Sequence, residues 1–124
     1  MNFLSLYKRR LLYKFKKKIN LDLNKEIKIN SLDELFSFYN TDKANKWNFD
    51  KREGHGFASF YEKHFKNFKK NKLNILEIGS FSGASAAAFS KYFPSSNIYC
   101  LDVNISNFKY LSDQIKVFGL DISN

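Results

Sequence analysis

Residues 73–93, LNILEIGSFSGASAAAFSKYF, decide the fold. The first six residues form a short apolar run rich in branched side chains, which predicts a buried strand. Gly79 ends that strand, and residues 79–83 form a turn of glycine and serine around one phenylalanine. The small residues from Ala84 onward predict a helix that stops at Pro94. This order of strand, glycine turn and helix is typical of α/β proteins.

The downstream sequence repeats the strand pattern twice. Residues 98–101 (IYCL) form a second apolar run that ends at Asp102, and residues 115–118 (IKVF) form a third that leads into Gly119. The weakly polar stretch 104–113 between them predicts a second helix. Alternating strands and helices indicate a parallel sheet with right-handed crossovers.

The spacing of the glycines and acids indicates a cofactor site. Gly79 lets the chain turn sharply out of the strand, and Gly83 allows close approach of a ligand or of the helix. The free N–H groups at the start of the helix attract an anion. Asp102, nineteen residues after Gly83, is placed to accept hydrogen bonds from ribose hydroxyls. A Walker loop is excluded because Ala84 and Ser85 stand where glycine and lysine belong.

Glu77-x-Gly79-x-x-x-Gly83 resembles motif I of the class I S-adenosylmethionine-dependent methyltransferases. The resemblance implies S-adenosylmethionine (SAM) as cofactor, with its methionine part held by the loop, its ribose by Asp102 and its adenine near Asp121. The implied cofactor-binding residues are Glu77, Gly79, Ser80, Gly83, Asp102 and Asp121. The sequence identifies no catalytic base and no metal ligands.

A second resemblance lies upstream of the first strand. Thr41-Asp42-Lys43, His55-Gly56-Phe57 and Tyr61-Glu62 occur in the order found in macrocin-type sugar O-methyltransferases, although Asn40 replaces the glycine that often precedes the first motif. These enzymes act on glycosylated natural products and surface polysaccharides. The resemblance therefore implies methyl transfer to a hydroxyl of a small molecule or glycan.

The resemblance covers only part of the family fold, which has seven strands. We expect a partial Rossmann-like fold, with strands 1–3 of a parallel sheet preceded by N-terminal helices. Residues 1–30 are expected to form a basic helix and linker, and residues 31–124 the N-terminal half of a methyltransferase domain. The first strand would then be an open edge. A truncated gene product is the favoured explanation, and a partner chain that completes the fold or N-terminal helices that cover the edge are the alternatives.

Positive charge is concentrated at the N-terminus. The net charge of the chain is +9. Residues 1–20 contain seven basic residues and no acidic one, and so carry +7 of that charge. Residues 1–19 also carry an apolar stripe at helical spacing: Leu4, Tyr7, Leu11, Phe15 and Ile19. The helix is predicted either to contact an anionic membrane surface or to pack its stripe on the domain or a partner. No apolar run is long enough to span a membrane. The single Cys100 suggests a reducing compartment, so we expect the cytoplasm or the inner face of its membrane.

Three other functions compete with methyl transfer. A non-catalytic binding or assembly module would keep half a cofactor site. A nicotinamide-dependent enzyme is disfavoured because Phe81 replaces the second glycine of the dinucleotide motif. A nucleic-acid binder is disfavoured because only three of the 21 basic residues are arginine, so no specific nucleic acid is expected.

Two local patterns complete the expectations: a capping box at Ser31 that starts a helix to about Tyr39, and an aromatic stripe in residues 57–68 that we interpret as core packing.

Overall fold

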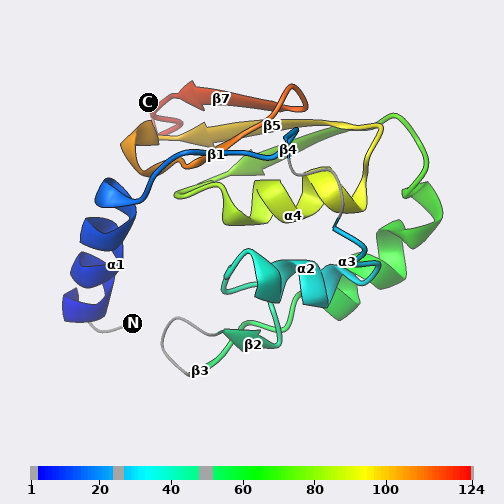
Figure 1. Cartoon of the computed structure of the whole chain (residues 1–124), viewed down its shortest axis with the longest axis horizontal. Helices are drawn as coiled ribbons and strands as arrows, with labels where there is room; N and C mark the ends of the chain where they lie inside the picture. Colours follow the sequence, from blue (N-terminus) through cyan, green and yellow to red (C-terminus); the bar gives the residue numbers. More distant parts are fainter. Residues whose placement is uncertain (1–2, 24–26, 48–51, 124) are drawn as a thin grey trace.

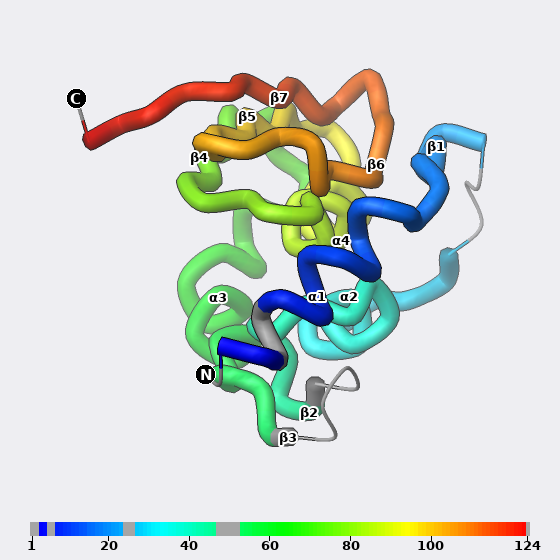
Figure 2. Tube along the Cα trace, turned by 90° about the vertical axis from the view of Figure 1, so that its left-hand side faces the viewer, coloured from blue at the N-terminus to red at the C-terminus, as the bar shows by residue number. Residues whose placement is uncertain are grey.

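The computed structural model describes residues 3–23, 27–47 and 52–123. Figure 1 shows a three-stranded sheet lying over α4, with α2 and α3 on the far side of α4 and α1 at one end of the sheet. Figure 2 faces that end and gives the same layers. In chain order the elements are α1 (Phe3–Phe15), β1 (Ile19–Asn20), α2 (Leu32–Phe38), β2 (Lys46–Trp47), β3 (Arg52–Glu53), α3 (Ala58–Phe65), the 3₁₀ helix η1 (Lys66–Phe68), β4 (Asn74–Ile78), α4 (Ala84–Tyr92), β5 (Asn97–Asp102), the 3₁₀ helix η2 (Ile105–Asn107), β6 (Tyr110–Leu111) and β7 (Ile115–Gly119).

The expected parallel sheet is confirmed. Its order is β4-β5-β7, with both pairs of strands parallel. Glu77 lies opposite Cys100, and Asp102 lies opposite Gly119. Because the strands run in one direction, Gly79, Asp102 and Gly119 all come to the same carboxyl edge. The three apolar runs therefore form three neighbouring strands of one parallel sheet, as the sequence predicts.

The expected helix at residues 104–113 is wrong. The chain instead forms η2 and the short strand β6, which pairs in parallel with β1. Asn104 starts η2 and its side chain accepts a hydrogen bond from the N–H of Ser106. Phe108 and Tyr110 are buried in the core. Residues 107–110 are buried in succession, and such a run does not fit the single apolar stripe of an amphipathic helix.

Among the described residues, helices cover one face of the sheet and leave the other face open. Ile98, Cys100 and Ile115 face α4 and are buried. Side chains alternate along a strand, so Leu76 and Ile78 face the other way, and they are 59% and 58% exposed. Parallel sheets in α/β proteins are normally covered on both faces. The opposite face, defined here by Leu76, Ile78 and Phe118, is called the bare face below.

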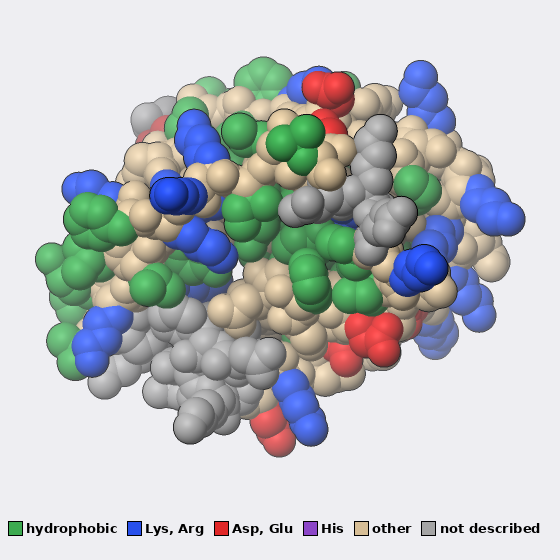
Figure 3. All heavy atoms as spheres, in the orientation of Figure 1, with side chains coloured by type: hydrophobic (Ala, Val, Ile, Leu, Met, Phe, Trp, Pro, Cys, Tyr) green, Lys and Arg blue, Asp and Glu red, His purple; other side chains and the backbone are tan. Residues whose placement is uncertain are grey.

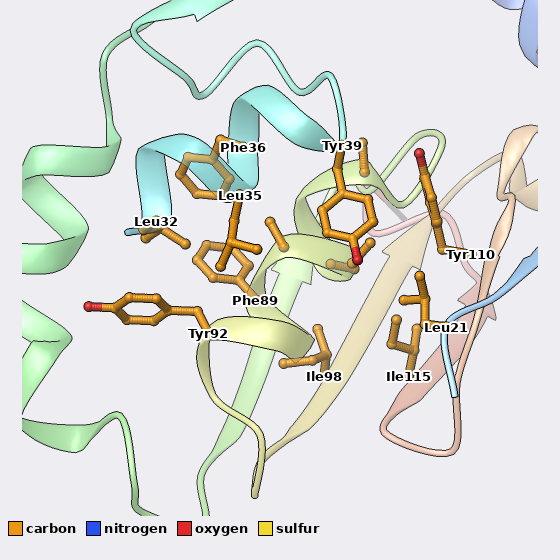
Figure 4. Close-up of a cluster of buried hydrophobic side chains, with 14 of the residues drawn as sticks. Leu21, Leu32, Leu35, Phe36, Tyr39, Phe89, Tyr92, Ile98, Tyr110 and Ile115 are labelled. Atoms are coloured by element: carbon orange, nitrogen blue, oxygen red, sulfur yellow. The ribbon is translucent and has the colours of Figure 1, made fainter. Parts of the chain in front are cut away.

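The core extends from the covered face of the sheet, around α4, to α2. The rings of Phe36 and Phe89 meet edge to face at 5.4 Å between centroids, and Figure 4 shows Phe36 of α2 directed toward Phe89 of α4. The capping box is confirmed, because the side chain of Ser31 accepts a hydrogen bond from the N–H of Glu34 at 3.1 Å. The N–H of Leu32 also donates to Glu62 on α3, at 2.6 Å. These contacts join the N-terminal helices to the sheet layer.

The aromatic stripe of residues 57–68 does not form core, contrary to our interpretation. Phe57, Phe60, Phe65 and Phe68 are all between 40% and 59% exposed, and only Tyr61 is packed against the core. The α-helix ends at Phe65 and continues as η1. The stripe therefore presents aromatic rings at the surface, two of which line a groove described below.

The N-terminal helix α1 is attached by side chains outside its predicted stripe. Tyr13 and Arg9 are buried, with 2% and 9% exposure. The stripe residues on α1 are exposed: Leu4, Tyr7, Leu11 and Phe15. The predicted packing of this stripe on the domain itself is therefore wrong. Within the described residues, no helix combines the length and the apolarity that crossing a bilayer requires.

Candidate functional site

The glycine turn at the end of β4 is tied to the neighbouring strand. The N–H groups of Gly79 and Ser80 both donate to the carbonyl of Leu101, at 2.8 and 3.3 Å. Gly79 has a φ of +76°, and a Cβ placed on it would meet nothing within 4 Å. The turn therefore needs glycine for its backbone conformation, and it leaves open space beside the carboxyl edge of the sheet.

Asp102 holds the turn from the end of β5. Its Oδ2 accepts a hydrogen bond from the N–H of Phe81 at 2.7 Å, and its Oδ1 accepts one from Asn104 at 2.9 Å. Phe81 has a positive φ of 46°, which a non-glycine residue adopts only when its surroundings enforce it. Asp102 is half-buried, and a carboxylate has about four lone-pair positions. It can therefore hold the loop and still accept hydrogen bonds from a ligand.

Glu77 is a buried carboxylate at the same edge. Its Oε1 accepts a short hydrogen bond from Ser85 Oγ, in the first turn of α4, and lies 3.3 Å from Lys43 Nζ. Its Oε2 is buried and has no hydrogen-bond partner among the described residues. A buried polar atom without a partner is costly and calls for an explanation. A ligand that donates to Oε2 would remove that cost.

Ser80 and Gly83 shape the turn. Ser80 is buried and its hydroxyl donates to the carbonyl of Glu77 at 3.1 Å. Gly83 starts α4 with a φ of +78°, and a Cβ there would lie 2.4 Å from the ring of Phe108. The close approach that Gly83 permits is thus made by Phe108. These two predicted cofactor residues lie in the turn with their contacts directed to the protein.

Cys100 lies beneath the turn on β5. Burial raises the pKa of its thiol to about 12, the hydrogen bond with Ser80 opposes that rise, and the charge of Glu77 adds to it. The thiol therefore stays protonated at neutral pH. Cys100 acts as a small buried apolar residue.

Asp121 lies apart from the turn. It is exposed, two residues beyond the end of β7, and its Oδ1 accepts hydrogen bonds from the N–H and hydroxyl of Ser123. These hydrogen bonds hold its pKa below the ordinary value. The preceding N–H, that of Leu120, donates to the carbonyl of Asp102 at 3.1 Å. The backbone thus places this segment beside Asp102.

The two upstream motifs form one tight double loop. Backbone N–H groups of residues 54–57 donate to carbonyls of residues 42–45, at 2.7 to 3.2 Å. A Cβ on Gly54 would lie 1.8 Å from the carbonyl oxygen of Ala44, so no other residue fits. Gly56 has a φ of +66°. His55, which follows Gly54, is exposed, and its Nε2 lies 3.9 Å from Asp42 Oδ2.

Two contributions to this edge escaped the sequence reasoning. Lys43 reaches from the double loop to Glu77. From α1, Arg9 lies over the ring of Phe81 at 4.8 Å, and Tyr13 meets the same ring edge to face at 5.5 Å. The T-D-K motif was a signal for Lys43, but sequence spacing cannot show contacts between residues so far apart. The described residues contain no group of three His, Cys, Asp or Glu side chains able to hold a metal ion.

No protein-family model and no curated protein matches the sequence. Among solved structures, the chain is similar to MycE, a methyltransferase of the mycinamycin biosynthetic pathway, in a complex with Mg, S-adenosylhomocysteine (SAH) and mycinamycin VI. The TM-score is 0.60 at 25% identity, over 76% of this chain and 25% of that one. A second MycE structure, in a complex with Mg and SAH, gives a TM-score of 0.59 at 26% identity, over 73% of this chain and 23% of that one.

This chain spans about a quarter of the length of MycE. The matched structures contain SAH, the product of SAM after methyl transfer, and SAM is the cofactor of that class of enzymes. In motif and in fold, the chain resembles the N-terminal part of a class I S-adenosylmethionine-dependent methyltransferase.

Proposed function

We propose that this chain binds SAM for methyl transfer to a hydroxyl group of a sugar or polysaccharide. The observation that carries the proposal is the buried Oε2 of Glu77, which has no hydrogen-bond partner among the described residues, at the edge that also holds Asp102. The open space at Gly79 lies in the same turn. A buried carboxylate oxygen without a partner among the described residues, a half-buried acid and an unobstructed glycine fit the polar ends of SAM. The T-D-K and H-G-aromatic motifs, together with the likeness to MycE, support the choice of acceptor.

Each residue has a definite task in this proposal. Asp102 accepts hydrogen bonds from the ribose hydroxyls, as an acid at the end of a second strand does in nucleotide-binding folds. Glu77 accepts hydrogen bonds from the methionine part. Gly79 keeps the edge open, while Ser80 and Gly83 hold the turn in shape. Asp121 is the candidate for the adenine side.

The bound cofactor would supply a methyl group on a sulfonium, which is already a good leaving group. The protein then has to orient the acceptor and help to remove its proton. The described residues reveal no base for that proton, so a non-catalytic SAM-binding module is the alternative. Methyl transfer to a glycan acceptor would distinguish the two.

Calorimetric titration of the 124-residue chain with SAH tests the proposal. We expect micromolar binding that is lost in a Gly79→Asp, Asp102→Ala variant. Asp113→Ala, which removes an exposed acid before β7, is the matched control and should bind as the parent does. A chain that is folded by circular dichroism and binds no SAH would overturn the proposal, and binding of NADH in its place would favour a nicotinamide enzyme.

We infer that further polypeptide covers the bare face and the free edge of β4. Within the part of the chain that the structure describes, the edge strand β4 pairs with β5 alone. A groove of about 620 Å³ runs beside it, lined mainly by aromatic and aliphatic side chains of α3, η1, α4 and β4. An added parallel strand followed by an amphipathic helix is the structure that suits such an edge. The greater length of MycE supports a complement of that kind, on this chain or on a partner.

We also propose that the outer surface of α1 contacts anionic lipid. This surface consists of Leu4, Tyr7, Leu11 and Phe15 with Lys8, Arg10 and Lys14. Figure 3 shows hydrophobic side chains between Lys and Arg over α1, at the left of the view. Such a mixture suits an interfacial helix that lies on a bilayer. It would bring the carboxyl edge of the sheet close to a membrane-bound glycan.

A further inference from the structure

Lys43 enters the carboxyl edge of the sheet from a separate part of the chain. Its Nζ lies 3.3 Å from Glu77 Oε1 and donates to Ser85 Oγ, also at 3.3 Å. Ser85 in turn donates to the same oxygen of Glu77. The three polar groups form a closed cluster in which Oε1 accepts the hydrogen bond of Ser85 and pairs with Lys43, while Oε2 has no hydrogen-bond partner among the described residues.

The backbone of Lys43 is fixed by the double loop. Its N–H donates to Thr41 Oγ1 at 3.4 Å, and its carbonyl accepts from the N–H of Phe57 at 3.0 Å. Gly54 keeps this loop closed, since a Cβ there would collide with Ala44. A lysine held at its base can place its charge with less loss of side-chain entropy. The loop therefore delivers Lys43 to Glu77 in a defined position.

The cluster has capacity for a ligand with two charges. An ammonium group has three N–H donors; that of Lys43 donates one to Ser85 Oγ and forms an ion pair with Glu77 Oε1. Its side chain is 23% exposed, whereas that of Glu77 is 9% exposed. Both residues line the charged end of the groove beside β4. A spare donor on a cation next to a spare acceptor on a buried anion is complementary to a zwitterion.

We propose that Lys43 is a further cofactor-binding residue, which takes the carboxylate of the amino-acid end of SAM while Glu77 Oε2 takes its ammonium. This inference rests on the proposed function, because it assigns one end of the same cofactor. A purely structural reading is the alternative, in which Lys43 only ties the double loop to the sheet. The two readings differ in their dependence on the amino-acid end of the ligand.

The test compares two ligands on the full 124-residue chain. SAH carries the amino-acid end, and 5′-methylthioadenosine has the same nucleoside and sulfur without it. For Lys43→Met we expect the Kd for SAH to rise by about 10- to 100-fold, the range for losing a hydrogen bond to a charged group. The Kd for 5′-methylthioadenosine should stay within about twofold, because Lys43 faces the part this ligand lacks. Lys43→Arg should restore part of the affinity for SAH, and the exposed Lys46→Met is the matched control.

Each outcome decides a separate claim. If the parent chain binds neither ligand, the proposed function fails and this inference fails with it. If the parent binds SAH and Lys43→Met binds it equally well, only the inference is overturned. Equal weakening of both ligands would also overturn it, since it would indicate a structural role. If Lys43→Met does not fold by circular dichroism, Lys43→Gln carries the same comparison, and an unchanged ratio of the two affinities in that variant would overturn the inference.

Discussion

Gly79 and Gly83 have the same left-handed backbone but different surroundings. Gly79 opens onto free space, whereas a Cβ on Gly83 would lie 2.4 Å from the ring of Phe108. Gly79→Ala should therefore cost only the conformational strain, about 1–2 kcal/mol of unfolding free energy. Gly83→Ala adds the clash with Phe108 and should cost about 2–5 kcal/mol. Urea unfolding of the two variants measures the difference.

The comparison is sharp because both changes add the same methyl group to the same turn. Equal losses of stability would contradict the close packing of Phe108 against Gly83. A further variant, Gly83→Ala with Phe108→Leu, should recover part of the loss if the ring is the obstacle. No recovery would place the cost in the backbone alone.

Residue patterns predicted the site where neighbours in sequence are also neighbours in space. The spacing from Glu77 to Gly83 located the turn, because strand, glycine and helix follow one another directly. The sequence predicted that Asp102 accepts hydrogen bonds from a ligand. It did not predict that Asp102 also accepts a hydrogen bond from the N–H of Phe81. Lys43 was visible as part of a motif, but its ion pair depends on how the double loop folds back. The double loop is held by backbone hydrogen bonds between residues 42–45 and 54–57. Because nearly every residue type can form such bonds through its backbone, the sequence does not predict them.

Helices and strands were predicted correctly where a short stretch of sequence carries the whole pattern of the element. The apolar runs of β4, β5 and β7 and the capping box of α2 were predicted correctly. The stretch 104–113 was not, because its buried residues pair with β1 and cover Gly83, contacts that no local pattern encodes. The stripes on α1 and α3 have helical spacing, yet most of their side chains are exposed. Periodicity identifies a helix and its apolar side, but it does not say what covers that side.

The exposed side of α1 leads to a prediction at this scale. The chain should co-sediment with vesicles of anionic phospholipid and not with neutral ones, because its cations and apolar side chains act together there. Changing Lys8, Arg10 and Lys14 to Gln should weaken binding by about 3 kcal/mol, at about 1 kcal/mol for each charge. The matched control, Lys63, Lys66 and Lys70 to Gln on and after α3, should bind as the parent does. Equal binding by both triple variants would contradict a specific role for α1.

The whole molecule is a parallel sheet with helices on one face. Ile98 and Ile115, which face α4, are buried. Leu76 and Ile78 on the bare face are more than half exposed. Apolar side chains in this number on an open sheet favour association with other polypeptide. The isolated chain should therefore self-associate as its concentration rises.

Leu76→Lys tests this view of the molecule. Because the side chain is 59% exposed, the charge should change the free energy of unfolding by no more than about 0.5 kcal/mol. It should also shift the chain toward monomer in sedimentation velocity, since two charged bare faces repel each other. Ile98→Lys, on the covered face of the neighbouring strand, should instead unfold the protein because the charge would be buried without a partner. If Leu76→Lys unfolds the isolated chain as Ile98→Lys does, the bare face is already covered, and no further polypeptide is needed to complete the sheet.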